Sequence, residues 1–73
     1  MTVRYFIRED EIFDEDGVAH TVYGIDVCIC GEVIRSIPDV FTEKKKAEKL
    51  IRLCNEGKLS PIHIDDVVEA ALD

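Results

Sequence analysis

The segment from Val18 to Cys30 constrains the fold most, because it alternates as a strand does and is nearly apolar on both faces. One face carries Tyr23, Ile25, Val27 and Ile29. The other face carries His20, Val22, Gly24, Asp26, Cys28 and Cys30. A strand that is apolar on both faces is usually central in its sheet or covered on both sides. The sequence therefore predicts a central strand over residues 18–30.

The preceding segment, Thr2 to Asp14, also alternates and predicts a hairpin with the central strand. A three-residue loop closed by Gly17 in the left-handed conformation places Tyr5 opposite Val27. In that register the apolar faces of both strands lie on one side of the sheet, as burial requires. A two-residue turn would put them on opposite sides, so we expect the longer loop. The acidic stretch Glu9-Asp10-Glu11 suits a strand poorly and predicts a bulge or a frayed segment.

A short third strand is expected from Val33 to Ile37. Gly31-Glu32 suits a type II′ turn leading into this strand. Pro38 is expected to end it, because proline donates no hydrogen bond to a ladder. The three segments together predict an antiparallel meander.

From Thr42 the apolar spacing changes from that of a strand to that of a helix. The apolar stripe consists of Ala47, Leu50, Ile51 and Cys54, with Leu53 at its edge. Thr42 is the expected N-cap, and Gly57 is the expected left-handed residue after the helix. Ser60 and Pro61 then predict the start of a second helix. The apolar stripe of that helix consists of Ile64, Val67, Val68, Ala71 and Leu72.

The order of these elements predicts an α+β fold, in which two C-terminal helices pack on one face of a three-stranded antiparallel meander. A chain of 73 residues allows one domain and no more, so residues 1–73 are expected to form a single unit.

Charge and hydropathy exclude several classes of partner. The 16 acidic and 9 basic side chains give a formal net charge of −7, which disfavours nucleic acid and anionic lipid. No apolar run approaches the roughly 18 residues that span a bilayer. The charged segment from Met1 to Asp10 lacks the apolar region of a signal peptide. We therefore expect a cytoplasmic protein with reduced thiols and no membrane partner.

Cys28, Cys30 and His20 share one face of the central strand and offer ligand types that zinc takes. A metal- or thiol-dependent binding site is therefore an alternative hypothesis. The spacing differs from the usual Cys-x2-Cys knuckle, and cysteine also packs as a small apolar residue. We expect packing rather than a cofactor, and we expect Cys54 in the core.

His63 falls in the first turn of the second helix, where a histidine could act as a base or a pH switch. The sequence places no matched nucleophile beside it. No phosphate-binding loop and no nucleophile elbow occur in the chain. We therefore expect no catalytic residue and no enzyme, and we assign His63 to an interaction surface.

The first helix has a basic face in an otherwise acidic chain. Its members are Lys44, Lys45, Lys46, Lys49 and Arg52. Such a face could dock an acidic partner or a phosphate group, or it could be solvated and balance the acidic second helix. The sequence alone leaves these alternatives open.

If both helices cover one face of the sheet, the opposite face keeps an apolar surface. Its expected members are Phe6, Val22, Cys28 and Cys30, with Val33 at the margin. Exposed apolar patches often mark interfaces, so this surface is the predicted interaction site. Another protein or a second copy of the chain is the expected partner.

Four stretches of the chain are characteristic in combination. They are Tyr23-Gly24-Ile25, Asn55, Leu59-Ser60-Pro61-Ile62-His63 and Asp66-Val67-Val68-Glu69. Together they resemble an uncharacterised family of short clostridial proteins, a domain of unknown function. The resemblance implies no activity, cofactor or catalytic residue. The sequence as a whole predicts a small cytosolic, non-enzymatic module that binds a protein partner or itself.

Overall fold

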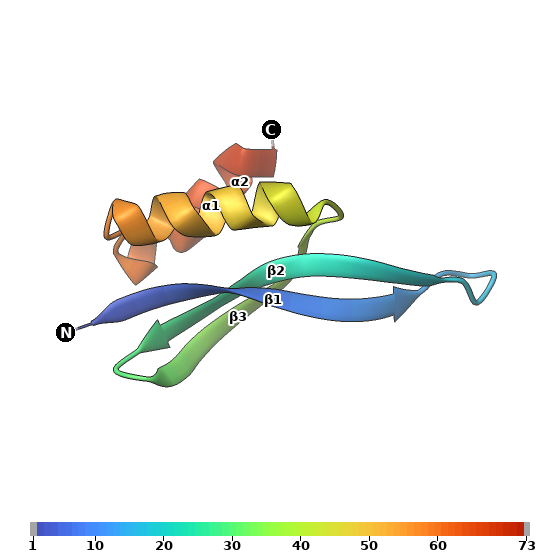
Figure 1. The fold of residues 1–73 in the computed structure, drawn as a ribbon, viewed down its shortest axis with the longest axis horizontal. Helices are drawn as coiled ribbons and strands as arrows, with labels where there is room; N and C mark the ends of the chain where they lie inside the picture. The colour runs from blue at the N-terminus through green and yellow to red at the C-terminus, as the bar shows by residue number, and fades with distance from the viewer. Residues whose placement is uncertain (1, 73) are drawn as a thin grey trace.

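The computed structural model describes residues 2–72, which form a three-stranded antiparallel sheet followed by two helices (Figure 1). The strands are β1 (Val3–Phe13), β2 (Ala19–Ile29) and β3 (Glu32–Phe41), in the order β1-β2-β3. The helices are α1 (Lys44–Glu56) and α2 (Ile64–Leu72), and a short 3₁₀ turn, η1 (Pro61–His63), precedes α2. The predicted α+β class and the central second strand are confirmed. Neither helix in this range has the length and apolar character that a membrane crossing requires.

The β1–β2 hairpin has the predicted register, with Tyr5 opposite Val27 and a loop closed by Gly17 at φ 77°. Asp14 holds this loop, because its carboxylate accepts two backbone hydrogen bonds from within it, both at 2.9 Å. All 11 residues of β1 pair one for one with β2, so the predicted bulge or fraying at residues 9–11 is wrong. Cross-strand pairing along the hairpin outweighs the poor strand propensity of the acidic residues.

β3 continues past Pro38 to Phe41, so the prediction that the strand ends at the proline is wrong. Gly24 of β2 faces three residues of β3, 38–40, which form a bulge in the register. Pro38 lies in this bulge, where the ladder does not need its missing N–H. Gly24 permits the close approach, because a Cβ at this position would lie 2.1 Å from the carbonyl oxygen of Ile37.

The β2–β3 turn uses Cys30 and Gly31 as its central residues, and not Gly31-Glu32 as predicted. Ile29 pairs with Glu32, and the two residues between them have φ values of 52° and 83°. Two positive φ values are typical of a type I′ turn, whose twist matches that of a hairpin. The left-handed conformation costs a non-glycine residue such as Cys30 roughly 1 kcal/mol.

The starts of the two helices differ in how well the sequence predicts them. α1 begins at Lys44 with Glu43 at the N-cap, so the predicted cap at Thr42 is wrong. Glu43 makes no side-chain hydrogen bond to the helix, so the cap leaves no strong sequence signal. Ser60 is extended and Pro61 opens the next helical segment as predicted, although its first turn is the 3₁₀ turn η1.

The C-terminal end of α1 is closed by Lys58 rather than by Gly57. Lys58 takes the left-handed conformation, with φ 51°, whereas Gly57 stays right-handed. The Lys58 N–H donates to the Asn55 carbonyl at 3.2 Å and the Leu59 N–H donates to the Cys54 carbonyl at 3.0 Å, which is the Schellman pattern. The position expected for glycine is therefore displaced by one residue.

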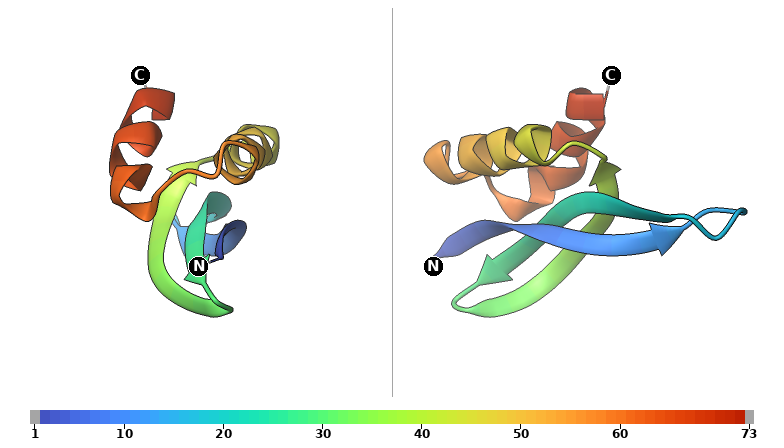
Figure 2. Two further views of the ribbon diagram at one scale, coloured as in Figure 1. Left: turned by 90° about the vertical axis from the view of Figure 1, so that its left-hand side faces the viewer. Right: turned by 45° about the vertical axis from the view of Figure 1, so that its right-hand side comes forward.

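Both helices lie over the same face of the sheet, as predicted (Figure 2). The core between them consists of Tyr5, Ile25, Val27, Val40, Leu50, Cys54, Ile64 and Val68. Arg35 on β3 forms a bidentate ion pair with Asp65 on α2, at 2.5 and 2.6 Å. This pair ties the last helix to the edge of the sheet.

The hairpin extends beyond the helices as an arm, which we define as residues 9–21 (Figure 1). Every residue from Glu11 to Thr21 is exposed. The arm gives the molecule its elongated shape, 44 × 27 × 18 Å. The fold thus has a covered end and an uncovered end.

Candidate functional site

The sheet face opposite the helices is interrupted by a polar network. Arg8 donates to Asp10 at 2.7 Å and forms a longer ion pair, 3.6 Å, with Asp26. Ser36 donates to the same Asp26 carboxylate at 2.6 Å. Val22, directly opposite Asp10, is only 2% exposed. The expected apolar surface is therefore divided in its middle by charged groups.

The predicted interaction residues lie in different environments. Phe6 is 53% exposed, but Val22 and Cys28 are buried although no helix covers their face. Cys30 is exposed in the β2–β3 turn and not on the strand face. His63 is exposed at the end of η1, before the helix that packs on the other face. The structure does not bring these five residues together into one surface.

The residues of the alternative metal site are far apart. His20 lies near the end of the hairpin, where its Nε2 is 2.8 Å from the Asp14 carboxylate. Cys28 lies eight residues further along β2, and the rise of an extended strand separates it from His20 by roughly 26 Å. Residues 2–72 contain no group of three His, Cys, Asp or Glu side chains that could hold a metal. The described residues therefore do not form a metal site from Cys28, Cys30 and His20, and a thiol-dependent role stays a prediction.

An apolar groove, which we call the helix groove, runs between α1 and α2. One part is lined by Leu50, Leu53, Cys54, Gly57, Leu59 and Val67. The adjoining part is lined by Phe41, Lys46, Lys49, Leu50, Leu53, Ala71 and Leu72. The two parts share Leu50 and Leu53 and so form one strip. Leu53 and Leu72 keep 56% and 58% of their surface exposed there.

The helix groove lies where the backbones of α1 and α2 stand apart above the sheet (Figure 2). α1 contacts all three strands, whereas α2 inserts Ile64 and Val68 into the core. The two helices stand side by side, and their side chains meet in the core, where Leu50 and Cys54 of α1 join Ile64 and Val68 of α2. Sequence reasoning missed this groove. The sequence feature that could have indicated the groove is Leu53, which makes the apolar face of α1 wider than the stripe that a sheet can cover.

Lysines border the helix groove at one end. Lys46 and Lys49 line it beside Phe41 and Leu72. A further depression on α1 is lined by Lys45, Glu48, Lys49 and Arg52. In a chain of net charge −7 this local excess of positive charge attracts carboxylates. The basic helix face noted in the sequence thus borders an apolar surface.

Asn55, near the end of α1, binds the free edge of β1. Its Oδ1 accepts from the Tyr5 N–H and its Nδ2 donates to the Tyr5 carbonyl, both at 2.9 Å. The Tyr5 hydroxyl donates to the Leu59 carbonyl at 2.5 Å. Burial raises the pKa of Tyr5, and the nearby Cys54 thiol raises it further. The Asn55 amide therefore takes the place of a neighbouring strand at one residue of the edge.

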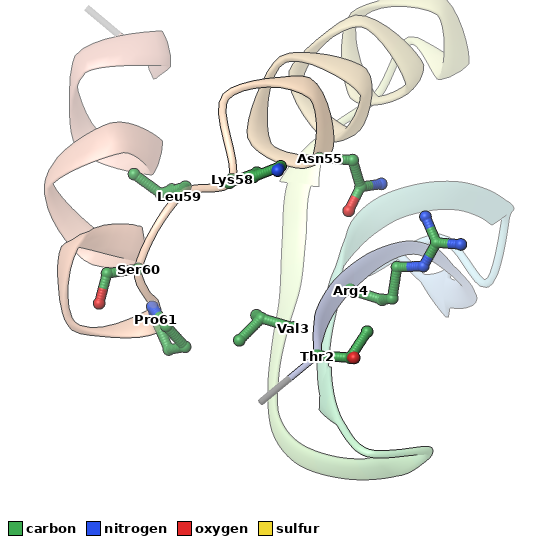
Figure 3. Close-up of a pocket in the computed structure, with 8 residues that line it drawn as sticks. All are labelled: Thr2, Val3, Arg4, Asn55, Lys58, Leu59, Ser60 and Pro61. Carbon is green, nitrogen blue, oxygen red and sulfur yellow. The ribbon is translucent and has the colours of Figure 1, made fainter.

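A shallow cleft lies beside Asn55, between the start of β1 and the segment that leads to α2 (Figure 3). It is lined by Thr2, Val3, Arg4, Asn55, Lys58, Leu59, Ser60 and Pro61. Alternate residues of a strand direct their backbone groups to the same side, so Val3 points its N–H and C=O outward as Tyr5 does. The next residue whose backbone points outward is Tyr5, and its N–H and C=O are already bound by Asn55. A strand that entered the cleft could therefore pair only with the backbone of Val3.

Comparison with known proteins identifies a family and no activity. A search of curated proteins and a search of solved structures gave no match. A family model described as a family of unknown function, DUF6514, matches residues 1–73. The match agrees with the resemblance to a domain of unknown function, and the clostridial origin stays a prediction. The chain therefore belongs to the DUF6514 family of unknown function over residues 1–73.

Proposed function

We propose that this chain is a non-enzymatic, cytoplasmic protein-binding module and that the helix groove is its binding surface. The ligand is a protein segment whose apolar side chains enter the groove and whose carboxylates meet the lysines at its border. Helical domains commonly bind amphipathic segments in grooves of this kind. The module has no catalytic or cofactor role in this proposal.

The exposure of Leu53 and Leu72 is the observation that carries the proposal. Each leaves more than half of its surface in solvent, 56% and 58%, within a groove lined mainly by apolar side chains. A 73-residue domain has little core, and each of these half-exposed leucines forfeits only part of the roughly 1.5–3 kcal/mol that full burial contributes. A bound segment recovers part of this hydrophobic contribution.

The charge at the border favours an acidic segment. Lys46 and Lys49 line the groove, whereas the second helix carries Asp65, Asp66 and Glu69. The Asp65 carboxylate is already paired with Arg35. An acidic segment therefore gains attraction from the α1 side of the groove.

A non-enzymatic role is supported by the surroundings of the histidines. His20 bonds to Asp14 at the exposed hairpin end, and residues 13–21 contain no serine or cysteine that this pair could activate. His63 is exposed at the end of η1, next to the exposed apolar side chain of Ile62.

The test is a titration of the ¹⁵N-labelled chain with an acidic amphipathic helical peptide that carries leucines at i, i+3 and i+7. We expect amide shifts concentrated at Leu53, Val67 and Ala71, and loss of binding in Leu53→Glu. The matched control is Ile62→Glu, because Ile62 is 78% exposed but does not line the groove. Shifts confined to the Phe6 face, or equal weakening by both substitutions, would contradict the proposal.

A further inference from the structure

The arm is the most acidic part of the molecule and also exposes apolar side chains. Its acidic residues are Glu9, Asp10, Glu11, Asp14, Glu15 and Asp16, and no lysine or arginine lies between Glu9 and Thr21. Ile12, Phe13 and Val18 are exposed near its end, and Phe13 keeps 66% of its surface in solvent. The arm thus combines apolar side chains with flanking carboxylates, which is the ligand chemistry that the helix groove favours.

The arm does not reach the groove of its own molecule. It projects past the helices, along the longest axis of the molecule, and its end lies well away from both of them (Figures 1 and 2). The strands of the arm pair along their whole length, so no hinge lets it fold back. A groove that receives an arm must therefore belong to another copy.

We propose that the acidic arm of one copy occupies the helix groove of a second copy. This inference rests on the proposed function of the groove and names its ligand. Phe13 is the apolar anchor, since a large aromatic side chain in a pocket is the usual centre of an interface. Glu9 and Glu11 lie on the same strand and meet Lys46 and Lys49 of the second copy. Two such contacts related by a twofold axis close a dimer.

Salt separates this arrangement from other modes of self-association. Two copies that each carry −7 repel one another overall, so added salt strengthens any association that lacks local charge pairing. A contact between the acidic arm and the lysine border is weakened by salt instead, because salt screens its attraction. The direction of the salt effect therefore reports whether opposite charges meet.

The experiment is sedimentation equilibrium of the full chain across concentration, at about 20 mM and about 500 mM sodium chloride, conditions between which the Debye length falls severalfold. We expect a dimer that dissociates as salt rises. Phe13→Ser should weaken it about tenfold or more, as loss of a central anchor does. Because Phe13 is exposed, the variant should keep the far-ultraviolet circular dichroism of the parent chain.

Charge reversal tests the pairing itself. Glu11→Lys and Lys49→Glu should each weaken the dimer roughly fivefold, and the double variant should regain most of the loss. Lys45→Glu is the matched control, because Lys45 is on the same helix but does not line the groove. A strict monomer at both salt concentrations, a dimer that salt strengthens, or a double variant no better than the single ones would overturn the proposal. If the acidic peptide still binds the groove of a monomeric chain, this inference alone fails and the proposed function stands.

Discussion

The two ends of the β1–β2 hairpin have the same strands and very different surroundings. At the covered end, residues 3–8, Tyr5 is buried in the core and its backbone is held by Asn55. In the arm the two strands contact little but each other, and every residue from Glu11 to Thr21 is exposed. The covered end therefore carries the stability of the fold, whereas the arm depends on strand pairing and on the Asp14 loop.

The difference shows which parts of this chain are free for another use. A domain of 73 residues is marginal in the surface it can bury. Substitutions in the arm and in the helix groove should therefore change binding, whereas those at the covered end should change folding. The predictions for Ile25 and for pH compare the two ends, and those for Asn55 and Lys58 test the covered end alone.

Ile25→Ala should have the largest effect on stability. Ile25 is fully buried at the centre of the core, so its truncation leaves a cavity that costs about 3 kcal/mol. Ile12→Ala removes a similar side chain from the arm, where Ile12 is exposed, and should cost less than about 0.5 kcal/mol. Urea denaturation of both variants checks the pair. Equal losses would mean that the arm belongs to the cooperative core.

Asn55→Ala should have the next largest effect. It removes the acceptor for the Tyr5 N–H and the donor for the Tyr5 carbonyl, and the two unsatisfied groups cost about 2 kcal/mol. The control is Glu56→Ala, which alters the neighbouring exposed residue. A stability for Asn55→Ala close to that of the control would show that water replaces the amide without cost.

Lys58→Gly should raise stability by about 1 kcal/mol, because glycine adopts the left-handed conformation of the Schellman motif without strain. Lys58→Ala removes the same charge but keeps a Cβ, and it should leave stability nearly unchanged. Thermal unfolding of the two variants separates backbone strain from charge. If alanine stabilised as much as glycine, repulsion by the lysine charge, rather than strain, would be the cause.

The two ends should respond to opposite extremes of pH. A hydrogen bond with His20, followed by one from the Val18 N–H, lowers the pKa of Asp14, so the stabilisation of the arm loop is present above the ordinary Asp pKa and is lost as pH falls below it. Burial raises the pKa of Cys54 and of Tyr5, so their contribution is present below their ordinary pKa values and is lost as pH rises above about 9–10. Amide spectra across pH should lose the arm signals first in acid. Loss of arm and core signals together at low pH would contradict this.

The sequence predicted the parts of the fold that depend on local pattern. The Gly17 loop and the alternation of the strands were sufficient for the hairpin register, because only one register buries both apolar faces. The helix stripes and the Ser60-Pro61 start followed from spacing in the same way. The extension of β3 past Pro38 was not predictable, because it depends on a bulge that only the absence of a side chain at Gly24 permits.

The candidate site was harder to predict than the fold, because it depends on how the helices sit relative to each other. The sequence placed Val22 on an open face, but in the structure it is only 2% exposed. Leu53 was assigned to the margin of a core stripe, but the separation of α1 and α2 leaves it exposed. Neither outcome follows from the residues of one element alone.

Amide hydrogen exchange at Phe6 and Ile12 tests most directly the claim that the covered end carries the fold and the arm is free to bind. Both residues lie on β1, and both direct their N–H toward β2, as alternation from the Tyr5 edge requires. In dilute solution we expect Ile12 to exchange roughly 100-fold faster than Phe6, because the arm opens without global unfolding. At concentrations where the chain associates, the exchange of Ile12 should slow while that of Phe6 changes little. Equal protection at the two sites in the dilute chain, or an Ile12 rate that does not depend on concentration in the associated chain, would contradict the account.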